Sequence, residues 1–296
     1  MIGRRAFIWT YSILIVCVVT LSASLAQIQV LKHLSRSAEL RSSAYLLRLD
    51  SYQVLFNLTR FLDHSASVVA IELGERGEPP DKLTPEVQCR VASWKDLIVN
   101  WLRDQGFEAK LVVSKLRIEE YEEQPIDEVL SSVVGRVAGV RGGMYISARL
   151  RLEITDLYTG MRCERKFNIA IPNGVRYYLL WQLSEDYLSD IVTLLSALDD
   201  RGYFSIEDLQ NAVNDKVQEH TNAFIKDLKE WGVEGEIRYH IDVLQVGDSE
   251  VFVGVYVERL SLIDIAGEKV VLNGFEKELI LCRREIYVTH IFTLMS

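Results

Sequence analysis

Residues 6–26, AFIWTYSILIVCVVTLSASLA, form an apolar stretch without a charged residue, directly after Arg4 and Arg5. An α-helix rises about 1.5 Å per residue, so a stretch of this length spans roughly 30 Å, the thickness of the hydrocarbon core of a bilayer. The paired arginines favour the cytoplasmic side under the positive-inside bias. The sequence therefore predicts a cytoplasmic tail over residues 1–5 and a transmembrane helix over residues 6–26. The protein is then a single-pass protein of the cell membrane, with the bulk of the chain outside the cytoplasm.

The same stretch also fits a cleaved signal peptide. Ser24 and Ala26 place small residues at the −3 and −1 positions of a signal-peptidase site ahead of Gln27. The apolar region before that site is longer than the usual ~7–15 residues. No Gly or Pro interrupts the helical pattern that crosses it. These features favour a retained anchor, with a secreted protein that starts at Gln27 as the alternative.

The chain as a whole is acidic. It has 33 Lys and Arg residues against 42 Asp and Glu residues, and a formal net charge of −9. This charge argues against nucleic acid and anionic head groups as partners of the outer part, and favours a soluble surface. The residues after the apolar stretch are numerous enough to bury one large core or two small ones.

The cysteines do not form a disulfide framework. Outside the apolar stretch only Cys89, Cys163 and Cys282 remain, an odd and widely spaced set. One disulfide with one free thiol and three free thiols are both compatible with the sequence.

Two stretches of the chain resemble each other in the order of their expected elements. Thr84-Pro85 opens a helix that Gly106 ends, and Ser205 opens a second helix that Gly232 ends. Apolar residues recur at helical spacing inside both: Val87, Val91, Trp94, Leu97, Ile98, Trp101 and Leu102 in the first, and Leu209, Val213, Val217, Phe224, Leu228 and Trp231 in the second. Strongly helical segments, 45–71 and 177–198, precede them.

Strands with one apolar face follow each helix. The alternating inward residues are Ile146, Ala148, Leu150, Leu152 and Ile154, then Phe167, Ile169 and Ile171, and in the second half Ile237, Tyr239, Ile241 and Val243. An apolar strand over 251–262 and a last strand over about 275–292, after an Asn273-Gly274 turn, complete the second half. Each half therefore reads helix, helix, strand, strand, strand.

These patterns predict an α+β fold with an N-terminal transmembrane helix and two similar modules. Each module packs two helices on one face of a small antiparallel sheet. We expect an extended amphipathic helix over residues 27–72, a first module over 84–175 and a second over 176–296. The first half differs by an insertion around residues 119–143.

No residue is assigned a catalytic, cofactor-binding or metal-ligating role. The sequence has no G-x-S-x-G, H-E-x-x-H, C-x-x-C or P-loop motif. The histidines lie far apart in sequence: His33, His64, His220, His240 and His290. A nucleophilic pair of Cys282 with His240 or His290 is left open, since such partners meet only in space. We predict that the protein is not an enzyme and has no cofactor.

Acidic residues and glycines are concentrated in the insertion. The acidic residues are Glu119, Glu120, Glu122, Glu123, Asp127 and Glu128. Calcium loops place their ligands on alternate residues around a turn glycine, and this run does not, so a solvated loop is favoured over a calcium site. The glycines that follow, Gly135, Gly139, Gly142 and Gly143, predict a hinge or a mobile loop.

Several aromatic residues are expected to pack rather than to bind ligand. Trp94, Trp101, Trp181 and Trp231 fall on apolar helix faces, which favours core packing over a carbohydrate platform. Tyr177 and Tyr178 begin a helix, where partial exposure and a place in an interface are expected.

The N-terminal pattern resembles that of type IV pilins and pseudopilin-like proteins of prokaryotes. Residues 6–71 contain no proline and read as one helical rod of roughly 100 Å, and antiparallel sheet follows. The resemblance implies assembly by packing of the N-terminal helices. Pilins also carry an acidic residue near the start of the mature apolar stretch, whereas here none occurs before Glu39.

These observations together predict an extracytoplasmic structural or interaction protein. Its expected partners are membrane lipid around the anchor, and other proteins or further copies of itself. The alternative is a membrane-tethered receptor that binds a ligand in a cleft between the modules.

Overall fold

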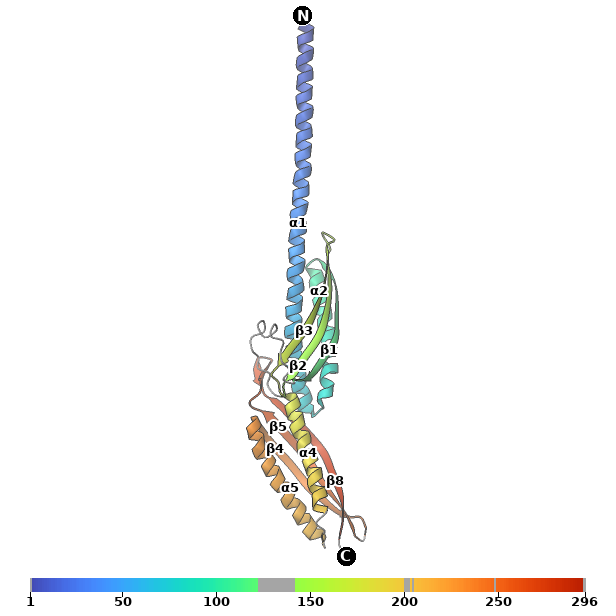
Figure 1. Cartoon of the computed structure of the whole chain (residues 1–296), viewed down its shortest axis with the longest axis vertical. Coiled ribbons are helices and arrows are strands. Elements are labelled where there is room, and N and C mark those ends of the chain that lie inside the picture. The colour runs from blue at the N-terminus through green and yellow to red at the C-terminus, as the bar shows by residue number, and fades with distance from the viewer. Residues whose placement is uncertain (1, 122–141, 200–202, 204, 248, 295–296) are drawn as a thin grey trace. The chain divides into compact units, whose positions relative to one another are not determined.

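The computed structural model describes residues 2–121, 142–199, 203, 205–247 and 249–294, without the side chains of residues 2–19. The chain has an α+β fold, as predicted, with long helices and antiparallel sheets (Figure 1). The predicted insertion around residues 119–143 lies mostly outside the described residues.

The first helix, α1, runs from Ile2 to Arg76 without a break (Figure 1). No proline interrupts it, and it ends where Gly77 adopts a left-handed conformation with φ of +68°. The residues expected to form one rod therefore lie in one helix. Among the residues that the structure describes, no helix is long and apolar enough to cross a membrane. Most of the predicted span over 6–26 falls on side chains outside that description.

The chain divides into two compact units. The first comprises residues 1–55, 97–112 and 151–166, and the second comprises residues 56–96, 113–150 and 167–296. The helix α2 (Leu83–Asp104) and the sheet of β1 (Phe107–Glu120), β2 (Met144–Asp156) and β3 (Arg162–Asn173) contribute to both units.

The first unit packs one face of α1 against the ends of the strands. Ser43, Leu47 and Ser51 of α1 are buried there, with Leu152 and Ile154 of β2. A tight turn joins β2 to β3, in which the Asp156 amide donates to the Met161 carbonyl at 2.8 Å. On the solvent side of this hairpin, Arg151 and Glu164 form a cross-strand ion pair at 3.0 Å.

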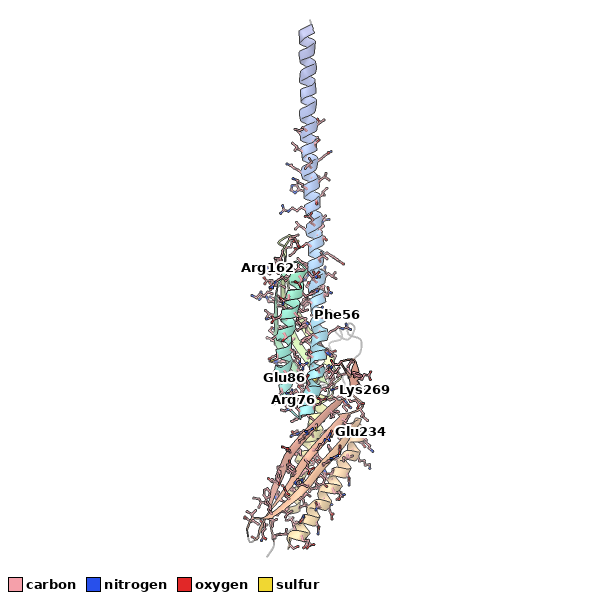
Figure 2. The ribbon with its side chains drawn as sticks, turned by 180° about the vertical axis from the view of Figure 1, so that it is seen from behind. Phe56, Arg76, Glu86, Arg162, Glu234 and Lys269 are labelled. Carbon is pink, nitrogen blue, oxygen red and sulfur yellow. The ribbon has the colours of Figure 1, made fainter. Side chains whose placement is uncertain are left out.

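The second unit contains a helix pair on one face of a three-stranded antiparallel sheet. The helices are α4 (Tyr177–Asp199) and α5 (Ile206–Leu228), and the strands are β4 (Val233–Gln245), β5 (Glu250–Asp264) and β8 (Leu279–Thr293) in the order β4-β5-β8. In Figure 1 both helices lie in front of the sheet, and the reverse view in Figure 2 shows its other face. The predicted cap of α5 is confirmed, since the Ser205 hydroxyl accepts from the Asp208 amide.

Two predicted element boundaries were wrong. Residue Leu83, and not Thr84, begins α2, because the short helix η1 (Pro80–Lys82) leads directly into it. The Thr84 hydroxyl instead accepts from the Ile118 amide at 3.0 Å. The strand expected over 275–292 is divided at Glu278 into β7 (Phe275–Lys277) and β8, and β7 pairs with β6 (Val270–Leu272) as a separate hairpin. The predicted Asn273-Gly274 turn before it is confirmed, since both residues have positive φ and join β6 to β7.

The order of elements occurs twice along the chain. Two helices precede three strands in α1-α2-β1-β2-β3 and again in α4-α5-β4-β5-β8, with β6 and β7 inserted before the last strand. Gly106 and Gly232 end the second helix of each series in the left-handed conformation, with φ of +87° and +64°. The carbonyl of each glycine accepts an amide proton, from Leu157 and Ile265 respectively, at 3.1 Å in both cases.

Candidate interaction surface on α1

An uncharged stripe runs along the exposed part of α1 over residues 21–52. Its positions alternate by three and four residues, which is the 3.5-residue period of coiled coils. All of them are exposed: Leu21, Ser24, Ile28, Leu31, Ser35, Ala38, Ser42, Tyr45, Leu49 and Tyr52. The large apolar side chains among them are 46–68% exposed. We call this set the α1 stripe.

The α1 stripe lies opposite the face that α1 packs on its own unit. Ser43, Leu47, Ser51 and Val54 are buried, and at about 100° per residue they point away from Tyr45, Leu49 and Tyr52. The two apolar faces therefore have different environments. One is covered by the unit's own strands, and the other meets solvent in the described chain.

No charged residue lies on the stripe itself. Lys32, Glu39, Arg41 and Arg48 flank it, whereas Arg36 and Asp50 lie further round the helix, at the heptad position of the buried Ser43. A helix face that excludes charge while its neighbours carry it is a usual mark of protein contact.

A shallow depression of about 420 Å³ lies on another side of α1. Its lining residues are His33, Arg36, Ser37, Leu40, Arg41, Ala44 and Met161. It is wide open to solvent, and no buried polar group points into it, so it offers little enclosure for a small ligand.

A buried polar corner ties α1 to the β2–β3 hairpin. The Ser43 hydroxyl donates to Asp156, and the Thr159 hydroxyl donates to the same carboxylate at 2.8 Å. The Tyr158 amide adds a third bond at 2.8 Å. These hydrogen bonds, led by the one from Ser43, hold the pKa of Asp156 below its ordinary value although burial opposes the shift.

The second unit has a similar corner at the corresponding place. The Arg176 guanidinium pairs with Asp264, whose side chain also accepts from the Gly267 amide at 2.8 Å. Arg176 also donates to the carbonyls of Trp231, at 2.9 Å, and of Gly232. In both corners an aspartate ending the second strand binds a residue at or just before the buried face of the first helix.

The histidines and Cys282 do not form a nucleophilic site. Cys282 and His290 are eight residues apart on β8, which corresponds to about 26 Å of strand. His240 instead contacts Glu258 at 3.1 Å and packs on the Tyr256 ring. Within the described residues, Cys89, Cys163 and Cys282 are free thiols, and no group of His, Cys, Asp or Glu could hold a metal ion.

The acidic run is described only in part. Glu119 and Glu120 end β1, whereas Glu122, Glu123, Asp127 and Glu128 lie outside the described residues, as do Gly135 and Gly139. Gly142 packs closely on α4, because a Cβ there would lie 2.4 Å from the Leu179 Cβ.

Of the two tyrosines at the start of α4, Tyr178 is half-buried, in line with the expected partial exposure, whereas Tyr177 is more buried than the sequence suggested. Tyr177 is fully buried and donates its hydroxyl to the Glu78 carbonyl. Tyr178 donates to the Ile118 carbonyl at 2.9 Å, and burial raises its pKa to about 12. Trp94 stacks on Phe61, and Arg283 lies over the Trp181 ring at 4.4 Å, so both tryptophans serve packing.

Sequence reasoning found α1 but missed the stripe. The signal was present as a 3.5-residue repeat without charges, but it could not be separated from the packed face by spacing alone. Comparison with known proteins adds nothing to this picture: no family model, curated protein or solved structure matches the chain.

Proposed function

We propose that the protein is a single-pass membrane-anchored, extracytoplasmic interaction protein, and not an enzyme. The apolar stretch at 6–26 anchors the chain, and α1 carries the stripe outward from it as a surface for protein contact. The observation that carries this proposal is the α1 stripe, an exposed, charge-free, apolar face on the same helix as the predicted span. Two compact units then provide the structural part outside the membrane.

Supporting observations come from the chemistry of the described residues. The buried polar groups of both corners are bonded to one another, which is typical of structural rather than catalytic groups. The depression on α1 is open, and the polar residues around it contribute no buried catalytic pair. A pilin-like assembly is a second candidate, favoured by one uninterrupted helix that precedes antiparallel sheet.

The membrane part of this proposal is tested by fractionation. Membranes from cells that produce the full chain are washed with alkaline carbonate, and the N-terminus of the protein in the pellet is sequenced. We expect the protein in the pellet with Met1 or Ile2 at its start. Recovery in the soluble fraction with Gln27 at its start would instead show a secreted protein, and processing near Ala6 would support the pilin-like candidate.

A further inference from the structure

α1 and α4 bury residues at the same spacing. Six of the buried residues of α1, Ser43, Leu47, Ser51, Val54, Leu58 and Leu62, have counterparts in a buried series that begins at Arg176, just before α4, and continues along α4 with Leu180, Ser184, Tyr187, Ile191 and Leu195. The helix α4 buries a wider face, since Leu179, Leu183 and Leu188 are buried there as well. Both series follow steps of four, four, three, four and four residues. The serines also correspond in their bonds, since Ser51 donates to the Arg48 carbonyl and Ser184 to the Trp181 carbonyl, each three residues back.

Two of the three stripe positions that have a counterpart on α4 differ in chemistry, whereas the third, Tyr45, corresponds to the half-buried Tyr178. At the places where α1 exposes Leu49 and Tyr52, α4 exposes Gln182 and Glu185. A helix that packs on its sheet in this way therefore does not need apolar residues on its outer face. The apolar residues of the α1 stripe have another cause, and a second protein surface is the simplest one.

We infer that residues 21–52 of α1 associate with the same segment of further copies of this chain, as a closed, parallel, in-register bundle. The 3.5-residue period of the α1 stripe supports another copy of this segment as the partner, because helices that supercoil around one another must share that repeat. Leu25, Leu34 and Leu46 flank the stripe and are exposed, which widens the apolar face beyond that of a two-stranded coil.

The charges beside the stripe are compatible with this arrangement. In a parallel in-register coil, a flanking residue meets the residue five positions further along its partner. These meetings would pair Gln27 with Lys32, Leu34 with Glu39, Arg41 with Leu46 and Arg48 with Gln53. None of these pairs brings like charges together.

The in-register alignment of the α1 helices is set by the common depth of their apolar stretches in the membrane, so this part of the inference rests on the proposed function. Displacing one chain by a heptad moves its apolar stretch by about 10 Å relative to a hydrocarbon core of about 30 Å. That displacement would draw Arg4 and Arg5, or Lys32 at the other end, into the core, where charged side chains are strongly disfavoured. Because all anchors lie at the same depth in the bilayer, the copies are not displaced along the helix axis. Copies related without such a displacement form a closed oligomer and not a helical filament.

Cysteine cross-linking in native membranes tests the contact. In the full chain with Cys17, Cys89 and Cys163 replaced by serine, Leu31→Cys lies on the stripe and Val30→Cys lies beside it, with similar exposure. After mild oxidation we expect at least tenfold more disulfide-linked dimer for Leu31→Cys. Equal yields at the two positions would overturn the inference. Co-expression of differently tagged Leu31→Cys and Ala38→Cys chains tests the register, because efficient mixed dimers would show a one-heptad stagger.

A second variant transfers the outer face of α4 to α1. Leu49→Gln with Tyr52→Glu introduces the residues of the corresponding α4 positions, and circular dichroism with a cooperative thermal transition establishes that the double variant is folded. We expect the cross-linking yield of Leu31→Cys to fall at least fivefold in this background, whereas the exposed control Gln53→Glu leaves it unchanged. A full yield in a folded double variant would contradict the contact.

Scoring the membrane pellet in the same experiment separates the two proposals. Cross-linking at Leu31→Cys in a protein that is not membrane-bound would support association and overturn the anchor. An anchored protein without that cross-link would retain the proposed function and lose the bundle.

Discussion

Arg176 and Asp264 form an ion pair that is almost entirely removed from solvent, with side-chain exposures of 8% and 2%. The guanidinium also satisfies two carbonyls at the end of η2 (Lys229–Trp231). A buried ion pair adds little net stability over apolar packing, but removing one partner leaves the other charged and desolvated. In the first unit the corresponding aspartate, Asp156, has hydroxyl partners instead.

We expect Arg176→Met to lower the free energy of unfolding by about 3–5 kcal/mol, because Asp264 is left as an uncompensated buried charge. Chemical denaturation of the detergent-solubilised chain measures this. The control is Arg117→Met. Arg117 is exposed, and its ion pair with Glu119 is long, at 3.9 Å, so its loss is expected to cost less than about 0.5 kcal/mol of unfolding free energy. A decrease in unfolding free energy of less than about 1 kcal/mol in Arg176→Met would show that the fold does not depend on the ion pair with Asp264.

The contribution of Asp156 to folding stability should decrease as pH falls. Its pKa is lower in the folded state than in the unfolded chain, so its contribution to stability is present above the ordinary value of about 3.9 and is lost as pH falls through the folded value. We expect Ser43→Ala to destabilise the chain by about 1.5–3 kcal/mol at pH 7, because it removes a hydrogen bond to a charged group.

Denaturation curves between pH 7 and pH 3 measure that difference. The gap between the wild type and Ser43→Ala should begin to narrow as pH falls below about 4 and should be lost only below the lowered pKa of Asp156 in the wild type, where the carboxyl is protonated in both proteins. Thr193→Ala is a matched control, since its exposed hydroxyl bonds only a carbonyl in its own helix. A gap that is constant across this range would exclude Asp156 as the group that responds.

At the scale of elements, α1 has two apolar faces with separate roles. Leu47 is 2% exposed and Leu49 is 51% exposed, although they are two residues apart on the same helix. Helical geometry places them on opposite sides, so one contributes to the fold of the first unit and the other to the α1 stripe.

Alanine substitutions on these two faces should therefore differ. We expect Leu47→Ala to cost about 2–5 kcal/mol of folding free energy, because it opens a cavity in the buried face. Leu49→Ala should cost less than about 1 kcal/mol and should instead weaken association, since its side chain already meets solvent in a single chain. Thermal unfolding together with sedimentation in detergent separates these effects. Equal destabilisation by both would mean that the stripe belongs to the fold.

At the scale of the whole molecule, the acidic charge and the uncharged stripe act in opposite directions. Copies with a net charge of −9 repel one another, and salt screens that repulsion. The α1 stripe itself carries no charge to be screened. Association through it should therefore persist or strengthen as salt rises.

We expect the apparent dissociation constant in detergent to stay the same or fall by up to about tenfold between 0.05 and 0.5 M NaCl. Sedimentation velocity at several protein concentrations measures it, and the Leu49→Gln, Tyr52→Glu variant provides the baseline for nonspecific contact. Dissociation at high salt would point to a charge-driven contact through the basic residues of α1 instead.

Local periodicity determined most of the elements of this protein. The 3.6-residue stripes predicted α2 and α5, the two-residue alternation predicted β2 and β4, and Gly106 and Gly232 marked two helix ends because the left-handed conformation favours glycine. The sequence also showed the repeated order of helices and strands. These features depend on neighbours along the chain, so the sequence contains them directly.

Tertiary contacts decided the rest. Thr84 bonds β1 instead of capping its own helix, and Tyr177 is buried under the end of α1, because both have partners distant in sequence. The α1 stripe could be recognised only after the strands had covered the opposite face at Leu47 and Val54. Spacing reveals that a helix has apolar faces, whereas only the folded chain shows which face remains in water.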